Sequence, residues 1–166
     1  MATLGERIGS VRTMALGIVE KLRWTAPTLA RICLGWVFVE SGWGKIHNLP
    51  RVIEFFQSLG IPAPEFQAPF AAWTEFLCGL AILLGVATRL SAIPIAITMV
   101  VAILTAKKDE LMGPADQPTD LAGKISALYG FSEYLYILLC VYLGLDGPGP
   151  ISIDRLIEKW VGKKES

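Results

Sequence analysis

Three carboxylates and one lysine occur in or beside the most apolar parts of this 166-residue sequence. Glu40 and Lys45 lie near the end of an apolar segment at residues 27–45. Glu75 lies inside a second apolar segment, and Glu133 begins a later one. A charge at the centre of a membrane helix costs about 2.5–3.5 kcal/mol, so such groups pair with one another or line a polar cavity. We therefore expect these four side chains to meet.

Aromatic side chains lie close to these charged groups. Trp43 and Trp73 each precede a charged residue by two positions, Tyr134 follows the third carboxylate directly, and His47 follows the lysine by two. Such rings can pack on a planar molecule, and a histidine can relay protons, although a loop histidine is more often merely exposed. The sequence thus predicts a polar cluster bordered by aromatic rings.

The first apolar segment should form a helix with one polar face. At 3.6 residues per turn, Trp36, Glu40 and Trp43 share a face, with the histidine one turn further. Gly35, Gly42 and Gly44 would let a neighbouring backbone approach closely. We expect this face to point into a helix bundle rather than at lipid.

The composition is that of a membrane protein. Hydrophobic residues make up 53% of the chain and charged residues 18%, against about 25% charged in an ordinary soluble domain. Fifteen basic and fifteen acidic residues cancel, without the basic stripe of a nucleic-acid-binding protein. We therefore expect the lipid bilayer, and not nucleic acid, as the partner.

Four apolar segments predict an all-α integral membrane protein, an antiparallel four-helix bundle with short interfacial helices. The predicted spans are residues 27–45, 69–87, 90–106 and 126–145, with a tight turn at Thr88-Arg89, an interfacial helix near 50–59 and a surface helix at 153–161. Residues 1–26 read as an amphipathic cytoplasmic segment, 27–146 as the bundle and 147–166 as a cytoplasmic tail. The excess of Lys and Arg beside these ends places both termini in the cytoplasm.

Two interpretations fit the polar cluster. In this topology Glu75 lies about 9 Å below the outer surface, near the depth of the other acids. Lys45 could pair with one carboxylate while the others are hydrogen-bonded, which would fix the register of the helices. Alternatively, a buried acid exchanges a proton with a headgroup bound in an outer-leaflet pocket. The second is favoured, because three acids and one lysine exceed what a register lock needs.

The opposite end of the bundle carries a second group of charges. Arg31 begins the first span, Arg89 lies in the tight turn, and Asp154 follows a Gly-Pro-rich stop. A structural ion pair between Asp154 and one arginine is the favoured interpretation. A site for anionic lipid or a cytoplasmic partner is the alternative.

Other chemistry has little support in the sequence. Cys33, Cys78 and Cys140 lie in apolar segments without metal or haem spacing, and they read as small buried hydrophobes, with a transient redox pair as the alternative. No haem, flavin or metal motif, phosphate loop, nucleophile elbow or HExxH occurs. This argues against a hydrolase or a kinase and leaves open whether the chain is an enzyme at all.

The order of several short motifs resembles the DoxX family of small four-span membrane proteins. The matching residues are Arg31, Ser41-Gly42-x-Gly44-Lys45, Phe56-x-x-x-Gly60-Ile61-Pro62-x-Pro64, Glu75, Gly79, Gly85-x-x-Thr88-Arg89, Gly147-Pro148-Gly149 and Ser152-Ile153-Asp154. The resemblance implies a four-helix transmembrane bundle of the bacterial or archaeal inner membrane. Namesakes of the family resemble subunits of a thiosulfate:quinone oxidoreductase, which implies a link to membrane redox complexes.

Residues and resemblance together lead to one functional hypothesis. The chain would be the membrane subunit of a redox complex that binds a quinone supplied from the membrane, with electrons carried by a redox partner subunit. Proton exchange would fall to Glu75, Glu40 and Lys45; the ligand-binding residues would be Trp43, Trp73, Glu133, Tyr134 and His47. A non-enzymatic scaffold or assembly factor is the alternative, and a solute or proton pathway a weaker one. The sequence is compatible with a homo-oligomer.

Overall fold

The computed structural model describes residues 12–14, 16–17, 20–113 and 119–162. Throughout these ranges every regular element is a helix, which confirms the predicted all-α fold. The helices are α2 (Thr25–His47), α3 (Leu49–Ser58), α4 (Pro64–Leu84), α5 (Thr88–Thr105), α6 (Lys108–Met112), α7 (Leu121–Gly130), α8 (Ser132–Asp146) and α9 (Ile153–Gly162). Much of the predicted N-terminal amphipathic segment, Arg7 included, lies outside the described residues.

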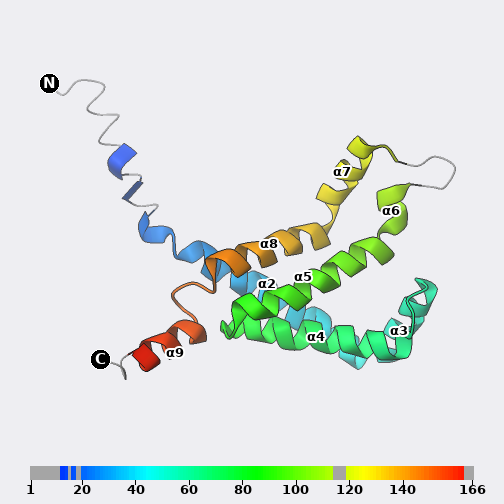
Figure 1. Ribbon diagram of the computed structural model, residues 1–166, viewed down its shortest axis with the longest axis horizontal. Coiled ribbons are helices and arrows are strands. Elements are labelled where there is room, and N and C mark those ends of the chain that lie inside the picture. The colour runs from blue at the N-terminus through cyan, green and yellow to red at the C-terminus, as the bar shows by residue number, and fades with distance from the viewer. Residues whose placement is uncertain (1–11, 15, 18–19, 114–118, 163–166) are drawn as a thin grey trace.

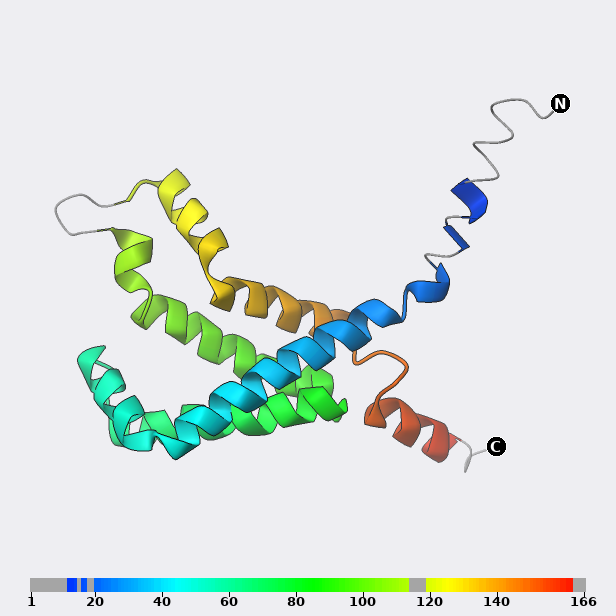
Figure 2. The same cartoon turned by 180° about the vertical axis from the view of Figure 1, so that it is seen from behind.

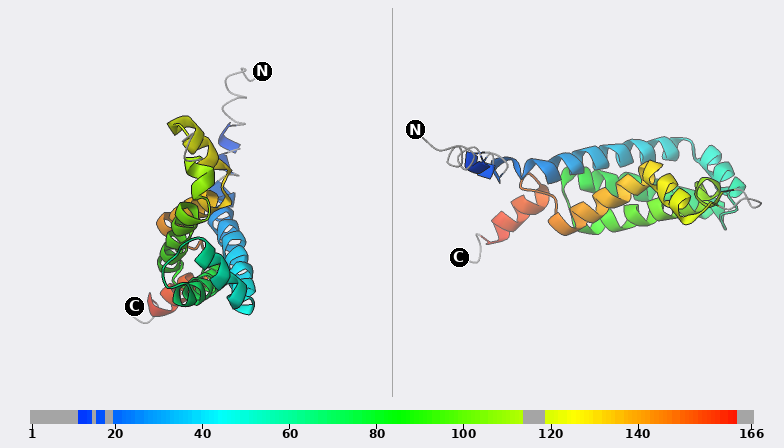
Figure 3. Two further views of the ribbon diagram at one scale, coloured as in Figure 1. Left: turned by 90° about the vertical axis from the view of Figure 1, so that its right-hand side faces the viewer. Right: turned by 90° about the horizontal axis from the view of Figure 1, so that it is seen from above.

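Four long helices pack side by side around a common core. α2 packs on α4, α4 on α5, α5 on α8, and α8 on α2 (Figure 1, Figure 2). Their core consists of Leu34, Phe38, Ile82, Ala92, Ile95, Met99, Cys140 and Leu143. Figure 3 shows α3 at one end of this group, called here the α3 end, and α9 with the α4–α5 turn at the other, called the α9 end.

The long helices are built for a bilayer rather than for water. α4 and α5 are each long and apolar enough to cross a membrane, and α7 with α8 adds a third span if the bent pair is counted as one. Large apolar side chains such as Leu77, Ile93 and Ile97 are more than half exposed on their outer faces. α2 does not meet the same requirement of length and apolar composition, so the prediction of four spans stays a prediction.

The fourth apolar segment is broken, whereas the sequence suggested one span over residues 126–145. α7 and α8 meet at 75°, and Phe131 between them has an extended backbone (φ −84°, ψ 129°). Gly130 favours such a break because glycine is a poor helix former. Phe131 is buried at the bend, and the Lys107 Nζ lies 5.6 Å from the centroid of its ring.

The turn between α4 and α5 lies slightly earlier than predicted. It runs over Gly85, Val86 and Ala87, whereas Thr88 and Arg89 already belong to the first turn of α5. Gly85 (φ 73°) ends α4 in the left-handed region, which glycine adopts readily, and Ala87 (φ 46°) precedes α5 in the same region. The predicted short helices at residues 50–59 and 153–161 are confirmed by α3 and α9.

Glycines let α2 and α4 pack very closely. A Cβ built at Gly35 would lie 2.6 Å from the Leu83 nitrogen, one at Gly79 would lie 2.8 Å from the Phe38 Cβ, and one at Gly42 would overlap the Phe76 backbone. Nothing lies within 4 Å of a Cβ at Gly44. The prediction of close approach is therefore confirmed at Gly35 and Gly42 and wrong at Gly44.

Candidate functional site

A buried carboxylate and a lysine form an ion pair where α2 meets α4. The Lys45 Nζ lies 2.5 Å and 2.6 Å from the two carboxylate oxygens of Glu75, and the Ser41 hydroxyl donates to Glu75 Oε2 at 2.9 Å. The Glu75 side chain is only 3% exposed and that of Lys45 33%. Glu75 therefore has three donor contacts from α2, and nearly all of the exposed surface of the pair belongs to the lysine side chain.

Helix geometry explains this arrangement. Ser41 and Lys45 are four residues apart, so they lie on one face of α2, with Gly42 beside them. Because α4 approaches this face closely at Gly42, the carboxylate of Glu75 lies between the two donors. Glu75 lies about 16 Å along the axis from Pro64, because α4 begins earlier than residue 69, and its predicted depth below the outer surface stays a prediction.

Aromatic residues next to the ion pair in the sequence form a group of ring contacts between α2 and α4. The ring of Phe76, the residue after Glu75, lies 5.6 Å from that of Trp43 and 6.1 Å from that of Trp73. Both tryptophans are about half exposed. Phe76 was not among the predicted ring residues, although its position next to Glu75 was the available signal. Trp43 and Trp73 thus belong to one group of rings through Phe76, and their contact with the polar group stays a prediction.

The face of α2 that carries Glu40 points outward, opposite to the prediction. Trp36, Glu40 and His47 are all exposed, and the His47 Nδ1 lies 2.9 Å from the Trp43 carbonyl oxygen within the same helix. The inward face is the one with Leu34 and Phe38, together with the glycines and Lys45. Close glycine packing selects that face, because the bulky Trp36 face could not approach α4 so closely.

The third carboxylate belongs to another place in the molecule. Glu133 begins α8 and accepts a hydrogen bond from the Ser132 hydroxyl at 3.2 Å, while the Tyr134 ring contacts Tyr129 at 5.5 Å. Lys107 lies nearby, and its pKa is raised by the hydrogen bond and charge of Glu110 and, to a smaller extent, by Glu133. Among the described residues no hydrogen bond or ion pair joins Glu133 or Glu40 to Glu75. The expected meeting of three acids is therefore corrected to one acid, one lysine and one serine.

At the α9 end, Asp154 connects the C-terminal helix to the α4–α5 turn. Its carboxylate accepts hydrogen bonds from the backbone nitrogens of Ala87 (2.8 Å) and Thr88 (3.3 Å), and its own nitrogen donates to the Gly85 carbonyl (3.0 Å). This group of bonds, called here the Asp154 clasp, caps the first turn of α5. Within the described ranges Asp154 forms no ion pair with an arginine, so the predicted salt bridge is replaced by backbone bonds.

The two arginines of that end have different surroundings. Arg31 is 5% exposed, and its guanidinium lies against Gly85, where a Cβ would overlap it. Two of its nitrogens, Nε and Nη1, are buried without a hydrogen-bond partner, and Asp154 attracts it only through space. Arg89 is exposed and makes one long contact, 3.5 Å, with the Leu145 carbonyl oxygen. Glycine at position 85 is therefore needed for the space that Arg31 occupies.

The cysteines and the possible metal ligands form no second site within the described part of the chain. Cys33, Cys78 and Cys140 are free thiols, at exposed, half-buried and buried positions respectively. The described residues contain no cluster of three or more His, Cys, Asp or Glu side chains suited to a metal ion. The Lys45–Glu75–Ser41 group therefore stands out as the polar feature buried between long apolar helices.

Fold and site together define a class: a multi-helix integral membrane protein with a buried ion pair between two closely packed helices. The DoxX family model matches residues 26–108, which include α3, α4, α5 and all of α2 except Thr25. The chain belongs to the DoxX family. No solved structure matches it.

Curated relatives cover most of the chain. "Putative oxidoreductase CatD" of Bacillus subtilis is 31% identical over 82% of this chain and 88% of its own length. "Uncharacterized membrane protein Rv3486" of Mycobacterium tuberculosis is 33% identical over 78% and 79%, respectively. "Inner membrane protein YqjF" of Escherichia coli is 30% identical over 85% and 98%. These similarities support a membrane location in contact with the lipid bilayer.

Proposed function

We propose that this protein is the membrane subunit of a redox complex and binds the headgroup of a quinone, or of a similar lipid-soluble carrier, beside Lys45 and Glu75. One observation carries the proposal. A charged acid–lysine pair is held between apolar helices with its lysine side chain 33% exposed, and the same two helices carry the contacting rings of Trp43, Phe76 and Trp73. The name of the Bacillus subtilis relative supports the oxidoreductase association.

The side chains suit the binding and protonation of such a headgroup. Lys45 Nζ can donate a hydrogen bond to a quinone carbonyl, and the half-exposed tryptophan rings offer a planar surface for its ring. Reduction of a quinone takes up two electrons and two protons. In the proposal a redox partner subunit supplies the electrons, and the Lys45–Glu75 pair exchanges protons with the reduced headgroup.

The proposed setting is the inner, or plasma, membrane, with both termini in the cytoplasm. The Escherichia coli relative is named an inner membrane protein, and the Lys and Arg residues beside the spans favour this orientation. In this orientation the pair lies toward the outer leaflet, because α2 runs outward from the α9 end. We further propose four spans, with α2 as the first. Lys45 is tolerated there because Glu75 of α4 neutralises its charge.

Extraction of bound lipids provides the test. Wild type, Glu75→Gln and the matched control Glu40→Gln would be purified in mild detergent, and their organic extracts analysed for quinones by mass spectrometry. We expect quinone with wild type and with Glu40→Gln, because Glu40 is exposed and outside the ion pair. Glu75→Gln should lose most of it. Equal quinone content in all three proteins, or none in wild type, contradicts the proposal.

A non-enzymatic scaffold is the second candidate, and the close glycine packing of α2 on α4 favours it. In that case the ion pair only fixes the register of the two helices. Glu75→Gln would then lower the thermal midpoint while wild type and variant both carried ordinary phospholipid alone. The same extracts, measured beside an unfolding curve, therefore distinguish the two functions.

A further inference from the structure

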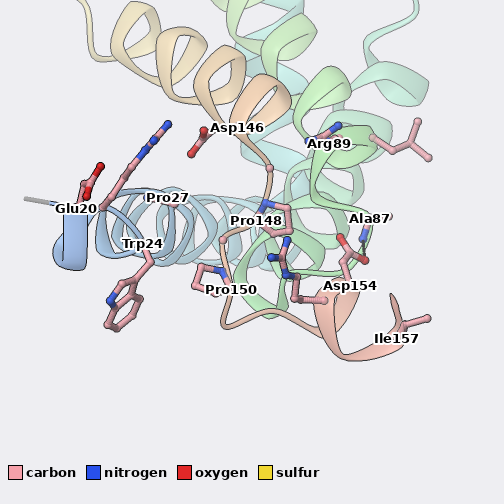
Figure 4. Close-up of a pocket in the computed structure, with 15 residues that line it drawn as sticks. Glu20, Trp24, Pro27, Ala87, Arg89, Asp146, Pro148, Pro150, Asp154 and Ile157 are labelled. Carbon is pink, nitrogen blue, oxygen red and sulfur yellow. Dashed lines mark hydrogen bonds between the residues drawn. The ribbon is translucent and has the colours of Figure 1, made fainter. Parts of the chain in front are cut away.

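A cavity at the α9 end lies where the bundle leaves the membrane. Its volume is about 840 Å³, and it is lined by the start of α2, the start of α5, the loop after α8, and α9. Figure 4 shows Asp154 next to Ala87 in this cavity, with Pro148 and Pro150 on the loop between α8 and α9. Because the membrane-length helices α4 and α5 meet at this end, the spans proposed above place the cavity at the level of lipid headgroups.

Arginines give this cavity its chemistry. Arg23, Arg89 and Arg155 line it, and none of them forms an ion pair with a described residue. Three carboxylates, those of Glu20, Asp146 and Asp154, also line it. That of Asp154 is already bound by the backbone nitrogens that open α5. Planar guanidinium groups are well suited to bind phosphate oxygens.

A second, apolar groove continues from the same arginine. It has a volume of about 460 Å³ and runs between α5 and α8, lined by apolar side chains such as Ile97, Val101 and Val141. Arg89 lines both the polar cavity and this groove. The groove is roomy near Gly144, where a Cβ would have nothing within 4 Å. The Arg89 guanidinium therefore lies where the charged headgroup of a bound lipid would meet its apolar tail.

From this juxtaposition we propose that the α9 end binds an anionic phospholipid, with its phosphate at Arg89 and one acyl chain in the groove between α5 and α8. The phosphate is bound by the charge of Arg89, which is exposed and makes only a 3.5 Å contact with the Leu145 carbonyl oxygen. The continuity of cavity and groove at Arg89 selects an amphipathic lipid over a soluble phosphate compound. This site is independent of the Lys45–Glu75 pair, because the two lie at different places along the bundle.

Lipid titration of delipidated protein tests the proposal. Native mass spectrometry would count phosphatidylglycerol and, with the same acyl chains, phosphatidylcholine bound to wild type, Arg89→Gln and the control Arg51→Gln, an exposed arginine on α3. We expect wild type to prefer phosphatidylglycerol, and Arg89→Gln to weaken its binding by about fivefold, the scale of one arginine near a lipid phosphate. Arg51→Gln should bind as wild type does. Equal binding of the two lipids, or equal losses in both variants, overturns the proposal.

The groove is tested separately. Gly144→Leu should fill it without a clash and lower the binding of long-chain phosphatidylglycerol, whereas Gly44→Leu, also in open space, should not. In wild type, a short-chain phosphatidylglycerol should bind more weakly than the long-chain lipid. Displacement of the lipid by millimolar glycerol phosphate would assign the cavity to a soluble phosphate and overturn the lipid site.

Discussion

Removing the ammonium of Lys45 gives the sharpest test of how the buried ion pair holds α2 against α4. In Lys45→Met, Glu75 keeps only the Ser41 hydroxyl as a donor and loses both short contacts to Nζ. Breaking a buried pair by removing one partner typically costs about 3–5 kcal/mol. Because the Lys45 side chain is 33% exposed, part of its charge is already screened, and we expect about 3 kcal/mol. For a chain of this size that corresponds to a midpoint lower by roughly 10 °C.

The assay is thermal unfolding in mild detergent, followed by tryptophan fluorescence. Lys45→Met would be compared with Glu75→Gln and with the double variant. In the double variant no uncompensated charge remains, so its midpoint should lie well above the value expected from adding the two single losses. Lys107→Met, which removes a surface ion pair with Glu110, should change the midpoint little. Additive losses in the double variant, or equal losses at Lys45 and Lys107, would refute the reasoning.

Three further predictions concern packing, capping and charge. Gly42→Leu should separate α2 from α4 and prevent recovery of folded protein in mild detergent, whereas Gly44→Leu should be recovered normally by size-exclusion chromatography. Asp154→Ala should lower stability by about 1 kcal/mol through loss of the α5 cap, and hydrogen exchange should increase at the first amides of α5. Glu110 raises the pKa of Lys107, so Lys107 keeps its proton to higher pH. Glu110→Gln should therefore speed the labelling of Lys107 by an amine-reactive reagent at alkaline pH by about twofold. Unchanged labelling would contradict this prediction.

The helices followed from the sequence because their signals are local. The length of the apolar segments predicted α4 and α5, and the residues rich in glycine and proline predicted the ends of α3 and α8. The break at Phe131 was missed, because a continuous apolar run reads as one helix whether or not a buried ring bends it. Local pattern therefore predicted which segments are helical better than it predicted where a helix turns.

The site was predictable only in part, because it depends on which face of α2 meets α4. Charge inside an apolar segment singled out Lys45 and Glu75, and the structure pairs them. The helical wheel alone favoured the Trp36 and Glu40 face, whereas the contacts at Gly42 turned α2 the other way. Which face of a helix points inward depends on contacts between segments far apart in the chain. Those contacts are hard to infer from a single sequence.

The Asp154 clasp has a consequence for how the protein is made. Ribosomes deliver α5 to the membrane before residue 154 exists, so the amide groups at the start of α5 must wait for α9. α9 then binds a turn that is already in place. Synthesis of α9 is thus the event that finishes the α4–α5 hairpin, and a chain that stops short of α9 would be left with an open end for quality-control proteases.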